Sequence, residues 1–242
     1  MKQALKSVVK GNPIVEKYAR ILMNRNNFAA LFPRKRISGK NNIIRVKNSV
    51  ILNNCKFDIA GNNNSVEIHC SAILNNVTFF IRGNQNKIEI GEKVRFWRGG
   101  ELWIEDYNGT IKIGNHSTFE NTHIAVTEPY SKIEIGEDCM FAYGIDIRTG
   151  DSHSIIDINT NKRINYAQDI SIGNHVWVAS HASILKGVTI GDNSVIATRS
   201  VVTKNFEEDH ILVGGSPARK LKEGINWDRQ RIYEEEQRII AS

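Results

Sequence analysis

The sequence predicts an all-β protein, a parallel β-helix in which the chain coils through flat faces of six residues. Three observations support this class. An aliphatic residue recurs at every sixth position between Ile172 and Val202. A small or β-branched residue follows four positions after most of them. A related pattern with a longer period occupies the chain upstream of these hexads.

The six-residue period excludes the usual elements, because an α-helix repeats about every 3.6 residues and a half-buried strand roughly every second residue. It is typical of a hexapeptide β-helix, in which each face adds a short strand to a parallel stack. The inward aliphatic positions are Ile172, Val178, Ile184, Ile190, Ile196 and Val202. The small positions, which let the corners close, are Val176, Ala182, Val188, Ser194 and Ser200.

Five upstream segments align with one another and extend the same prism. They are GKNNIIRV at 39, GNNNSVEI at 61, GNQNKIEI at 83, DYNGTIKI at 106 and EPYSKIEI at 128. Their first aliphatic positions, 22 or 23 residues apart, are Ile44, Val66, Ile88, Ile111 and Ile133. Each coil therefore exceeds three hexads by about four residues, which Gly and Asn supply as turns because both tolerate the left-handed backbone region. We predict about seven or eight coils over residues 39–222.

Both ends of the prism are predicted to carry helices. Residues 1–38 are expected to form a basic helical cap, and residues 223–242 a C-terminal helix that follows the break at Gly224. Residues 1–47 hold twelve Lys/Arg and one acidic residue, a net charge of +11, whereas the remainder of the chain carries −5. Such a segment is either the solvated face of a cap or a contact for an anionic polymer, a membrane surface or an acidic partner.

Composition excludes several classes of protein. The 242 residues are 40% hydrophobic with only four prolines, which excludes a disordered chain. No apolar run is long enough to cross a membrane, and residues 1–13 lack the apolar core of a signal peptide, so we expect a cytoplasmic protein. The three cysteines form no CxxC motif and fit a reducing compartment. The basic residues lack interleaved aromatic residues, which argues against a nucleic-acid partner.

One extruded loop, residues 148–169, interrupts the repeat between Ile147 and Ile170. A loop of about twenty residues on a rigid scaffold is uncommon unless it is functional. It carries His153 in a Gly-Asp-Ser-His run. A histidine, with an ordinary pKa of about 6.5, suits general-base work on a sugar hydroxyl. The alternative for a lone loop histidine is an ordinary surface residue.

Two runs at the C-terminal side carry a family resemblance. The run VWVASHASILKGVTIGDNSVIATRSVVTKNF, followed by GGSPARKLK, resembles the hexapeptide-repeat acyltransferases, which fold as left-handed β-helices. Within them it is most similar to the galactoside, maltose and capsular-polysaccharide O-acetyltransferases. The segment TGDSHSIIDINTNKRIN, followed by DISIGNHVW, resembles the sialic-acid O-acetyltransferase subgroup. The resemblance is strong over residues 133–222, weaker over 39–132 and absent at both ends.

The resemblance implies a role for individual residues. His153 aligns with the catalytic histidine, and Trp177 with a tryptophan that helps to form the acceptor and thioester site; the alternative for Trp177 is an aromatic that covers a coil face. The cofactor-binding residues that it implies are Trp177, Ala179, Ser180, Thr198, Thr203, Lys204, Arg219 and Lys222. The basic members suit the phosphates of coenzyme A. One departure is Arg199, since the family has Gly-Ala-Gly where this chain has Ala-Thr-Arg.

The expected function is transfer of an acetyl group from acetyl-CoA to a hydroxyl of a sugar, in a capsular or other cell-surface polysaccharide of a bacterium. His153 is expected to deprotonate the acceptor in a ternary complex, with the oxyanion stabilised by backbone N–H groups near Trp177 and Ala179 or by a side chain that the sequence does not assign. No metal is expected. Similar enzymes are homotrimers with sites between subunits, and the basic N-terminus is a possible peripheral contact with the inner membrane.

Three alternatives stay open at this point. The first is N-acetylation of an amino sugar by the same fold. The second is a non-catalytic β-helix that serves as a scaffold or binding protein, which would explain the hexads but not the histidine loop. The third is a zinc enzyme, which would need three converging histidines, with His69, His116 and His123 as the candidates.

Overall fold

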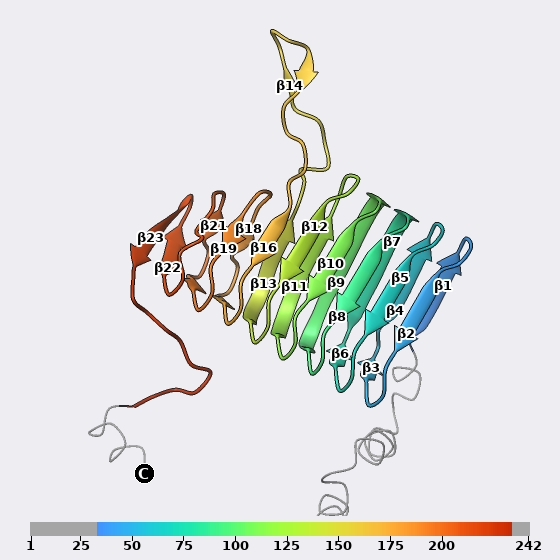
Figure 1. The fold of residues 1–242 in the computed structure, drawn as a ribbon, viewed down its shortest axis with the longest axis horizontal. Coiled ribbons are helices and arrows are strands. Elements are labelled where there is room, and N and C mark those ends of the chain that lie inside the picture. Colours follow the sequence, from blue (N-terminus) through green and yellow to red (C-terminus); the bar gives the residue numbers. More distant parts are fainter. Residues whose placement is uncertain (1–32, 234–242) are drawn as a thin grey trace, which may run out of the picture.

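Strands from successive coils lie side by side and form a parallel β-helix (Figure 1). The structure is a computed structural model that describes residues 33–233. Within that range the chain forms strands, turns and extended segments and no α-helix, so no helix there is long and apolar enough to span a membrane. The coils follow one another in chain order from the N-terminal to the C-terminal end of the stack.

Two sheets make up the walls of the prism. The 14-stranded sheet contains β1 (Arg34–Ser38), β3 (Ile51–Asn53), β4 (Lys56–Ala60), β6 (Ile73–Asn75), β7 (Val77–Asn84), β9 (Arg95–Tyr107), β11 (Thr118–Val126), β13 (Met140–Arg148), β17 (Trp177–Val178), β18 (Ser183–Ile184), β20 (Val195–Ile196), β21 (Val201–Val202), β22 (Leu212–Gly215) and β23 (Ala218–Lys222). The 7-stranded sheet contains β2 (Ile43–Val46), β5 (Ser65–Ile68), β8 (Lys87–Ile90), β10 (Thr110–Ile113), β12 (Lys132–Ile135), β16 (Ile170–Ile172) and β19 (Thr189–Ile190).

The strand register confirms the predicted aliphatic positions. Neighbours in the 7-stranded sheet pair them in sequence: Ile44 with Val66, Val66 with Ile88, Ile88 with Ile111, Ile111 with Ile133 and Ile133 with Ile170. Downstream, Ile172 pairs with Ile190 and Val178 with Ile196, so a coil there spans three hexads. The period thus shortens from 22 residues to 18 where the cofactor-binding residues were predicted.

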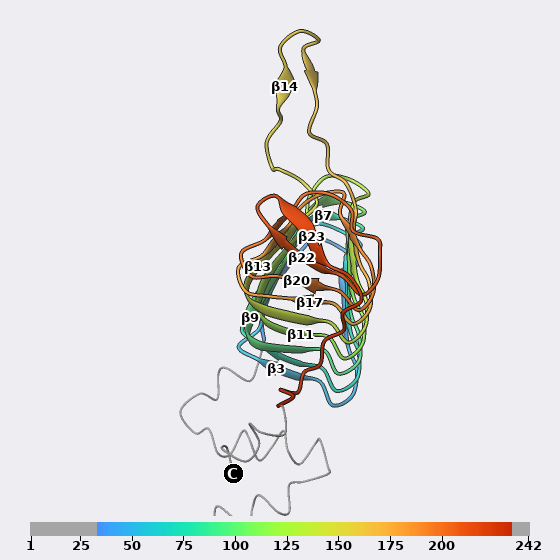
Figure 2. The ribbon, with the colours of Figure 1, turned by 90° about the vertical axis from the view of Figure 1, so that its left-hand side faces the viewer.

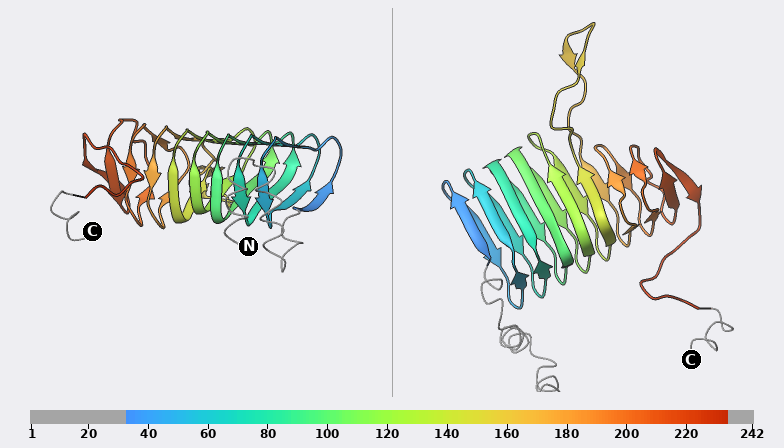
Figure 3. Two further views of the ribbon diagram at one scale, coloured as in Figure 1. Left: turned by 90° about the horizontal axis from the view of Figure 1, so that it is seen from below. Right: turned by 180° about the vertical axis from the view of Figure 1, so that it is seen from behind.

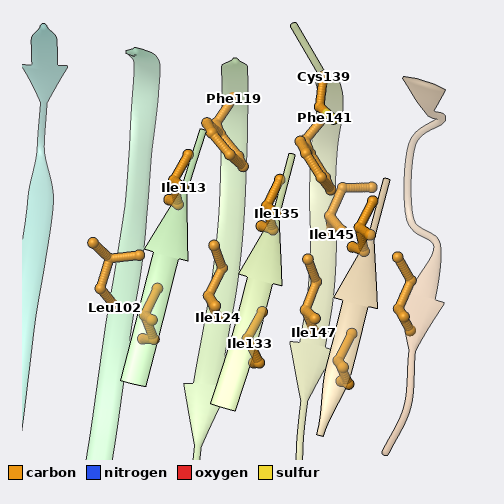
Figure 4. Packing of buried hydrophobic residues seen from close by; sticks show 14 of the residues in the cluster. Leu102, Ile113, Phe119, Ile124, Ile133, Ile135, Cys139, Phe141, Ile145 and Ile147 are labelled. Carbon is orange, nitrogen blue, oxygen red and sulfur yellow. The ribbon is translucent and has the colours of Figure 1, made fainter. Parts of the chain in front are cut away.

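The interior is filled by aliphatic and aromatic side chains that stack from coil to coil (Figure 4). Phe119 is fully buried, and its ring stacks between those of Phe96 and Phe141 at centroid distances of 4.4 and 4.6 Å. The predicted small positions are buried as well, including Val176 and Ala182. Each coil therefore buries its apolar face only against its neighbours, as repeat proteins do.

Asparagine side chains bridge the upstream turns. Asn64, with 1% of its surface exposed, donates from Nδ2 to Oδ1 of Asn42 at 3.0 Å, and its own Oδ1 accepts from the backbone N–H of Asn86 at 3.0 Å. Gly61 lies in the same turn with φ +133°, and a Cβ there would come within 1.7 Å of the carbonyl oxygen of Gly83. These turns account for the Gly/Asn clusters of the 22-residue repeat.

Between β13 and β16 the chain leaves the stack and projects as a long hairpin (Figure 2). Its tip is a two-stranded antiparallel sheet of β14 (Ile156–Asp157) and β15 (Lys162–Arg163). Several apolar side chains along it face solvent, Ile158 with 93% of its surface exposed. The hairpin projects away from the body of the prism, well clear of the coils (Figure 3).

The predicted helical termini need correction. Residues 34–38, assigned to the N-terminal cap, form β1 and pair with β4, so the prism begins before residue 39. The rest of that cap, residues 1–32, lies outside the described residues, as does the C-terminal part, 234–242. Residues 223–233, predicted as the start of a helix, form bends and irregular segments instead. The reason is tertiary contact, because Trp227 is 7% exposed and its indole Nε1–H donates to the carbonyl of His175 at 2.7 Å.

The C-terminal end of the stack reverses direction. β23 runs antiparallel to β22, the opposite of the parallel pairing between β20 and β22. Four of the five residues of β23, Arg219 to Lys222, are exposed. The last ladder of the prism is thus closed by a hairpin whose outer strand is mostly basic.

Candidate active site

Asn165 organises the base of the hairpin that carries His153. Asn165 is 6% exposed, and its Nδ2 donates to the carbonyl of His153 at 2.7 Å and to Oδ2 of Asp151 at 2.9 Å. Its Oδ1 accepts from the backbone N–H of Ile155 at 2.7 Å. One buried amide therefore fixes the backbone on both sides of the histidine, which is the usual way in which a buried polar side chain specifies a loop.

Two ion pairs fasten this base to the prism. Lys186, from the segment after β18, pairs with Asp151, and Arg163 of β15 pairs with Glu128 from the turn before β12. The hydrogen bond from Lys186 holds the pKa of Asp151 below its usual range, with smaller contributions from Asn165 and Arg163. Asp151 therefore stays ionised and keeps its hold on Lys186 near neutral pH.

His153 itself is exposed at the base of the projecting hairpin. Its backbone N–H donates to the carbonyl of Asp151 at 2.8 Å, while its imidazole makes no hydrogen bond to any residue within 33–233. A fixed backbone with a free, solvated imidazole is the arrangement that a general base needs before its substrate arrives.

Replacing Asn165 by alanine is expected to lower kcat by about tenfold or more, because the loss of its bonds lets the His153 segment shift from its productive position. Thermal unfolding should change little, since the hairpin lies outside the packed core. Asn159→Ala, on the exposed tip of the same hairpin, is the matched control. Steady-state kinetics and a thermal melt of both variants check this, and an Asn165→Ala enzyme with unchanged kcat would contradict it.

Trp177 lies in β17, next to the end of β13 that is farther from the hairpin. It pairs with Met140 at the start of β13, whereas the hairpin leaves after Arg148 at its end. The C-terminal tail packs here, because the ring of Trp227 stacks on His175 at 4.2 Å and lies 6.1 Å from the ring of Trp177. The tail thus supports the tryptophan that was predicted to form the site, a contact that the predicted helix did not foresee.

The tail is held by a further set of polar contacts. The ring nitrogens of His175 lie 2.8 Å from Oδ2 of Asp138 and 3.1 Å from the carbonyl of Trp227. Arg229 donates to Oδ1 and to the carbonyl oxygen of Asp138 at 3.0 and 3.1 Å. Burial raises the pKa of Asp138, but the bonds from His175 and Arg229 outweigh it and lower that pKa overall.

The backbone donors expected for an oxyanion are occupied. The N–H of Trp177 donates to the carbonyl of Ser194 at 2.9 Å, and that of Ala179 to the carbonyl of Ile196 at 2.8 Å. Both groups belong to the ladder between coils and cannot turn to a substrate without breaking it. The expectation that they stabilise an oxyanion is therefore wrong for this arrangement of the chain.

The segment after β20 contains backbone N–H groups that are free, and Thr198 carries one of them. The N–H of Thr198 bonds to no residue within 33–233, while its hydroxyl donates to the carbonyl of Ser180 at 2.8 Å. Arg199, the departure from the family pattern, is exposed, has φ +56° and donates its N–H to the same carbonyl at 2.9 Å. Its side chain thus lies at the surface rather than inside the prism.

The predicted phosphate-binding cations are exposed and uncompensated. Lys204, Arg219 and Lys222 have no acidic partner within 4 Å among the described residues. Their neighbour Lys220 differs, since it pairs with Glu208 and Glu223. Thr203 is exposed beside Lys204. Cations without acidic partners suit a polyanionic ligand, because no existing ion pair must break.

The histidines proposed for a zinc site have separate surroundings. His123 lies 3.0 Å from Asp146, and His69 lies 4.0 Å from Glu89. Residues 33–233 contain no group of three His, Cys, Asp or Glu side chains placed to hold a metal ion.

Comparison with known proteins identifies the family. The family model for bacterial transferase hexapeptides (six repeats) matches residues 169–204. The crystal structure of the polysialic acid O-acetyltransferase OatWY superposes with a TM-score of 0.77 at 31% sequence identity, covering 84% of this chain and 93% of that one. The chain belongs to the hexapeptide-repeat acetyltransferases. The predicted resemblance is thereby confirmed.

Sequence alignments with curated relatives cover shorter spans. The polysialic acid O-acetyltransferase of Neisseria meningitidis is 36% identical over 124 residues, 51% of this chain and 57% of that protein. The galactoside O-acetyltransferase of Escherichia coli K12 is 33% identical over 140 residues, 56% of this chain and 66% of that protein. The sequence matches thus span less than two thirds of the length of each of these curated relatives.

Proposed function

We propose that this protein transfers an acetyl group from acetyl-CoA to a hydroxyl of a saccharide. The observation that carries the proposal is the exposed imidazole of His153 on a hairpin base fixed by Asn165 and by two ion pairs. The relatives named above support it, because they act on polysialic acid and on galactosides. A non-catalytic scaffold would not need a histidine held in this way.

Acetyl-CoA supplies an activated acetyl group as a thioester. The free N–H of Thr198 and the half-buried Ser180 beside it suit the pantetheine arm, and the uncompensated Lys204, Arg219 and Lys222 suit the phosphates. These residues come from the last coils, where each coil contains the fewest residues. Trp177, which pairs with Val195 of β20 and lies 6.1 Å from the ring of Trp227, provides an aromatic wall beside these coils.

His153 does the proton work in this proposal. Its imidazole takes the proton of the acceptor hydroxyl as that oxygen attacks the acetyl carbon, and it returns the proton to the departing thiolate. Trp177 lies beside the start of β13, and His153 follows the end of β13. A single chain therefore does not bring the two side chains together. We therefore propose a homotrimer in which the hairpin of one subunit reaches the last coils of its neighbour.

The acceptor and its setting are also proposed from the relatives. A capsular or other cell-surface polysaccharide fits the names of the polysialic acid enzymes, and its modification before export would place the protein in the cytoplasm. The basic segment expected to contact an anionic polymer or membrane lies mostly outside the described residues.

An acceptor screen tests the proposal. The full chain is incubated with acetyl-CoA and with oligosialic acid, a galactoside, maltose or glucosamine, and release of free thiol is followed. Thiol release with a saccharide hydroxyl acceptor, with the ester found by mass spectrometry, supports the proposal. Release with glucosamine alone would replace it by N-acetylation, and no release with any acceptor would refute it.

Lys204→Glu is expected to raise the KM for acetyl-CoA about tenfold or more, because a lost contact with a charged group costs about 1.5–3 kcal/mol. The KM for the saccharide should stay the same. Lys112→Glu, an equal charge change on β10, is the control. The KM for acetyl-dephospho-CoA is then compared with the KM for acetyl-CoA in both enzymes. If the ratio of the two KM values is the same in the mutant as in the wild type, Lys204 does not contact the phosphate that this analogue lacks.

A further inference from the structure

A groove lies beside the hairpin base on the outer face of the 14-stranded sheet. It has a volume of about 360 Å³ and reaches from Trp103 across Ala125 to Arg148 and Ser152. Ser152 directly precedes His153, so one lining residue of the groove is the sequence neighbour of the candidate base. A volume of this size falls within the range of about 300–1,000 Å³ that small-molecule sites occupy.

The strand register explains why there is a hollow here. Trp103, Ala125 and Arg148 occupy paired positions on β9, β11 and β13, so their side chains leave the same face in a row. Ala125 is the small member between two large ones, and it forms the floor. The row runs across the strands, with successive side chains about 4.8 Å apart.

Trp103 provides a supported aromatic wall. Its ring stacks on that of Phe80 at 3.7 Å, and the guanidinium of Arg82 covers Phe80 at 3.9 Å. The stack holds Trp103 in one orientation, so that it loses little freedom when a ligand packs against it. An apolar ring face beside polar groups suits a pyranose, which has apolar C–H faces and hydroxyls around its edge.

Thr127 adds an independent sign of a ligand. It lines the groove, is 8% exposed, and its buried Oγ1 has no hydrogen-bond partner within residues 33–233. Gly150, which also lines the groove, cannot be replaced by a larger residue without a shift, because a Cβ there would stand 2.4 Å from this hydroxyl. Buried hydroxyls are rarely left without a partner, since the loss costs about 1–3 kcal/mol.

Charged groups complete the far wall. Arg148 donates to Asp146 from Nε and Nη2 at 2.8 and 2.9 Å, and His123 contacts Asp146 at 3.0 Å. Burial raises the pKa of Asp146, but the bonds from His123 and Arg148 outweigh it and hold that pKa low. The cluster is therefore fixed, and Arg148 retains N–H groups that Asp146 does not use.

We infer that this groove is the acceptor subsite, in which one sugar ring packs on Trp103, bonds to Thr127 and Arg148, and presents its hydroxyl to His153. The inference rests on the proposed acetyl transfer to a saccharide. It makes Trp103 and Thr127 determinants of acceptor affinity without any part in binding acetyl-CoA.

Two substitutions test the subsite: the first removes a large side chain, and the second keeps the shape of the side chain. Trp103→Ala is expected to raise the acceptor KM about tenfold, with Trp103→Phe recovering part of the loss. Thr127→Val keeps the shape and removes the hydroxyl, so the acceptor KM should rise about two- to tenfold while the melting temperature stays equal or increases. The KM for acetyl-CoA should stay within about twofold in each. The acceptors used are oligosialic acid and maltose.

Trp97→Ala is the matched control, because Trp97 is a half-exposed tryptophan on the same strand but outside this groove. Wild-type values in both Trp103→Ala and Thr127→Val would overturn the subsite and leave the proposed function standing. Loss of the native oligomer in Trp103→Ala with an unchanged acceptor KM would make this face an interface and also overturn it.

Calorimetric titration of the wild type with the same saccharides, without acetyl-CoA, separates the two proposals. Binding that Trp103→Ala weakens, together with no acetyl transfer, would refute the proposed function but support a saccharide site. Neither binding nor transfer would refute both.

Discussion

Replacing His153 by alanine is expected to lower kcat by about 100- to 10,000-fold, the usual contribution of general acid–base catalysis. The side chain is exposed and its imidazole makes no bond within the described residues, so folding and acetyl-CoA affinity should stay nearly intact. Thiol release under saturating substrate measures kcat, and a thermal melt measures stability.

His69→Ala serves as the control, because His69 is a partly exposed histidine on an upstream turn, far along the stack from the hairpin. It should retain the wild-type kcat. A His153→Ala enzyme whose kcat stays within about threefold of the wild type would remove His153 from the mechanism.

Phe119→Ala should destabilise the prism by about 3–5 kcal/mol, the typical cost of truncating a buried phenylalanine. Phe119 is the middle ring of three that stack between coils, so its loss leaves a cavity in contact with both neighbours. Because each coil is stabilised by adjacent coils, the cavity weakens two interfaces at once.

The midpoint of chemical denaturation measures this loss of stability. Phe119→Leu, which keeps most of the volume, should lose much less. A loss below about 1 kcal/mol for the alanine variant would mean that the coils close around the cavity.

Much of the fold could be predicted because the residues that pair in a β-helix are separated by a regular spacing in the sequence. Ile88 pairs with Ile111 because they hold the same place in consecutive coils, and that place is visible in the sequence. The C-terminal tail has no such repeat. The local pattern from Trp227 onward favours a helix, but the contacts of Trp227 with His175 and of Arg229 with Asp138 outweigh that local preference.

The candidate site divides in the same way. His153 and Trp177 were found through short runs that the family shares, but their supports were not. Asn165 lies within the predicted loop and Lys186 within the hexads, but the sequence singled out neither, because a hydrogen bond across the base of a hairpin corresponds to no regular spacing in the sequence. The paired row of Trp103, Ala125 and Arg148 was also missed, since only the register of the long strands shows that they share a face.

The reversed last strand bears on how copies of this protein meet. A parallel stack has the geometry to continue from one molecule into the next and to build filaments, since its end strands carry unpaired backbone groups. Here β23 runs antiparallel to β22 and carries the exposed cations Arg219 and Lys222, while β1, the first strand within residues 33–233, carries Arg34, Lys35 and Arg36. A head-to-tail contact between these two strands would join like charges, and their repulsion disfavours growth into fibres.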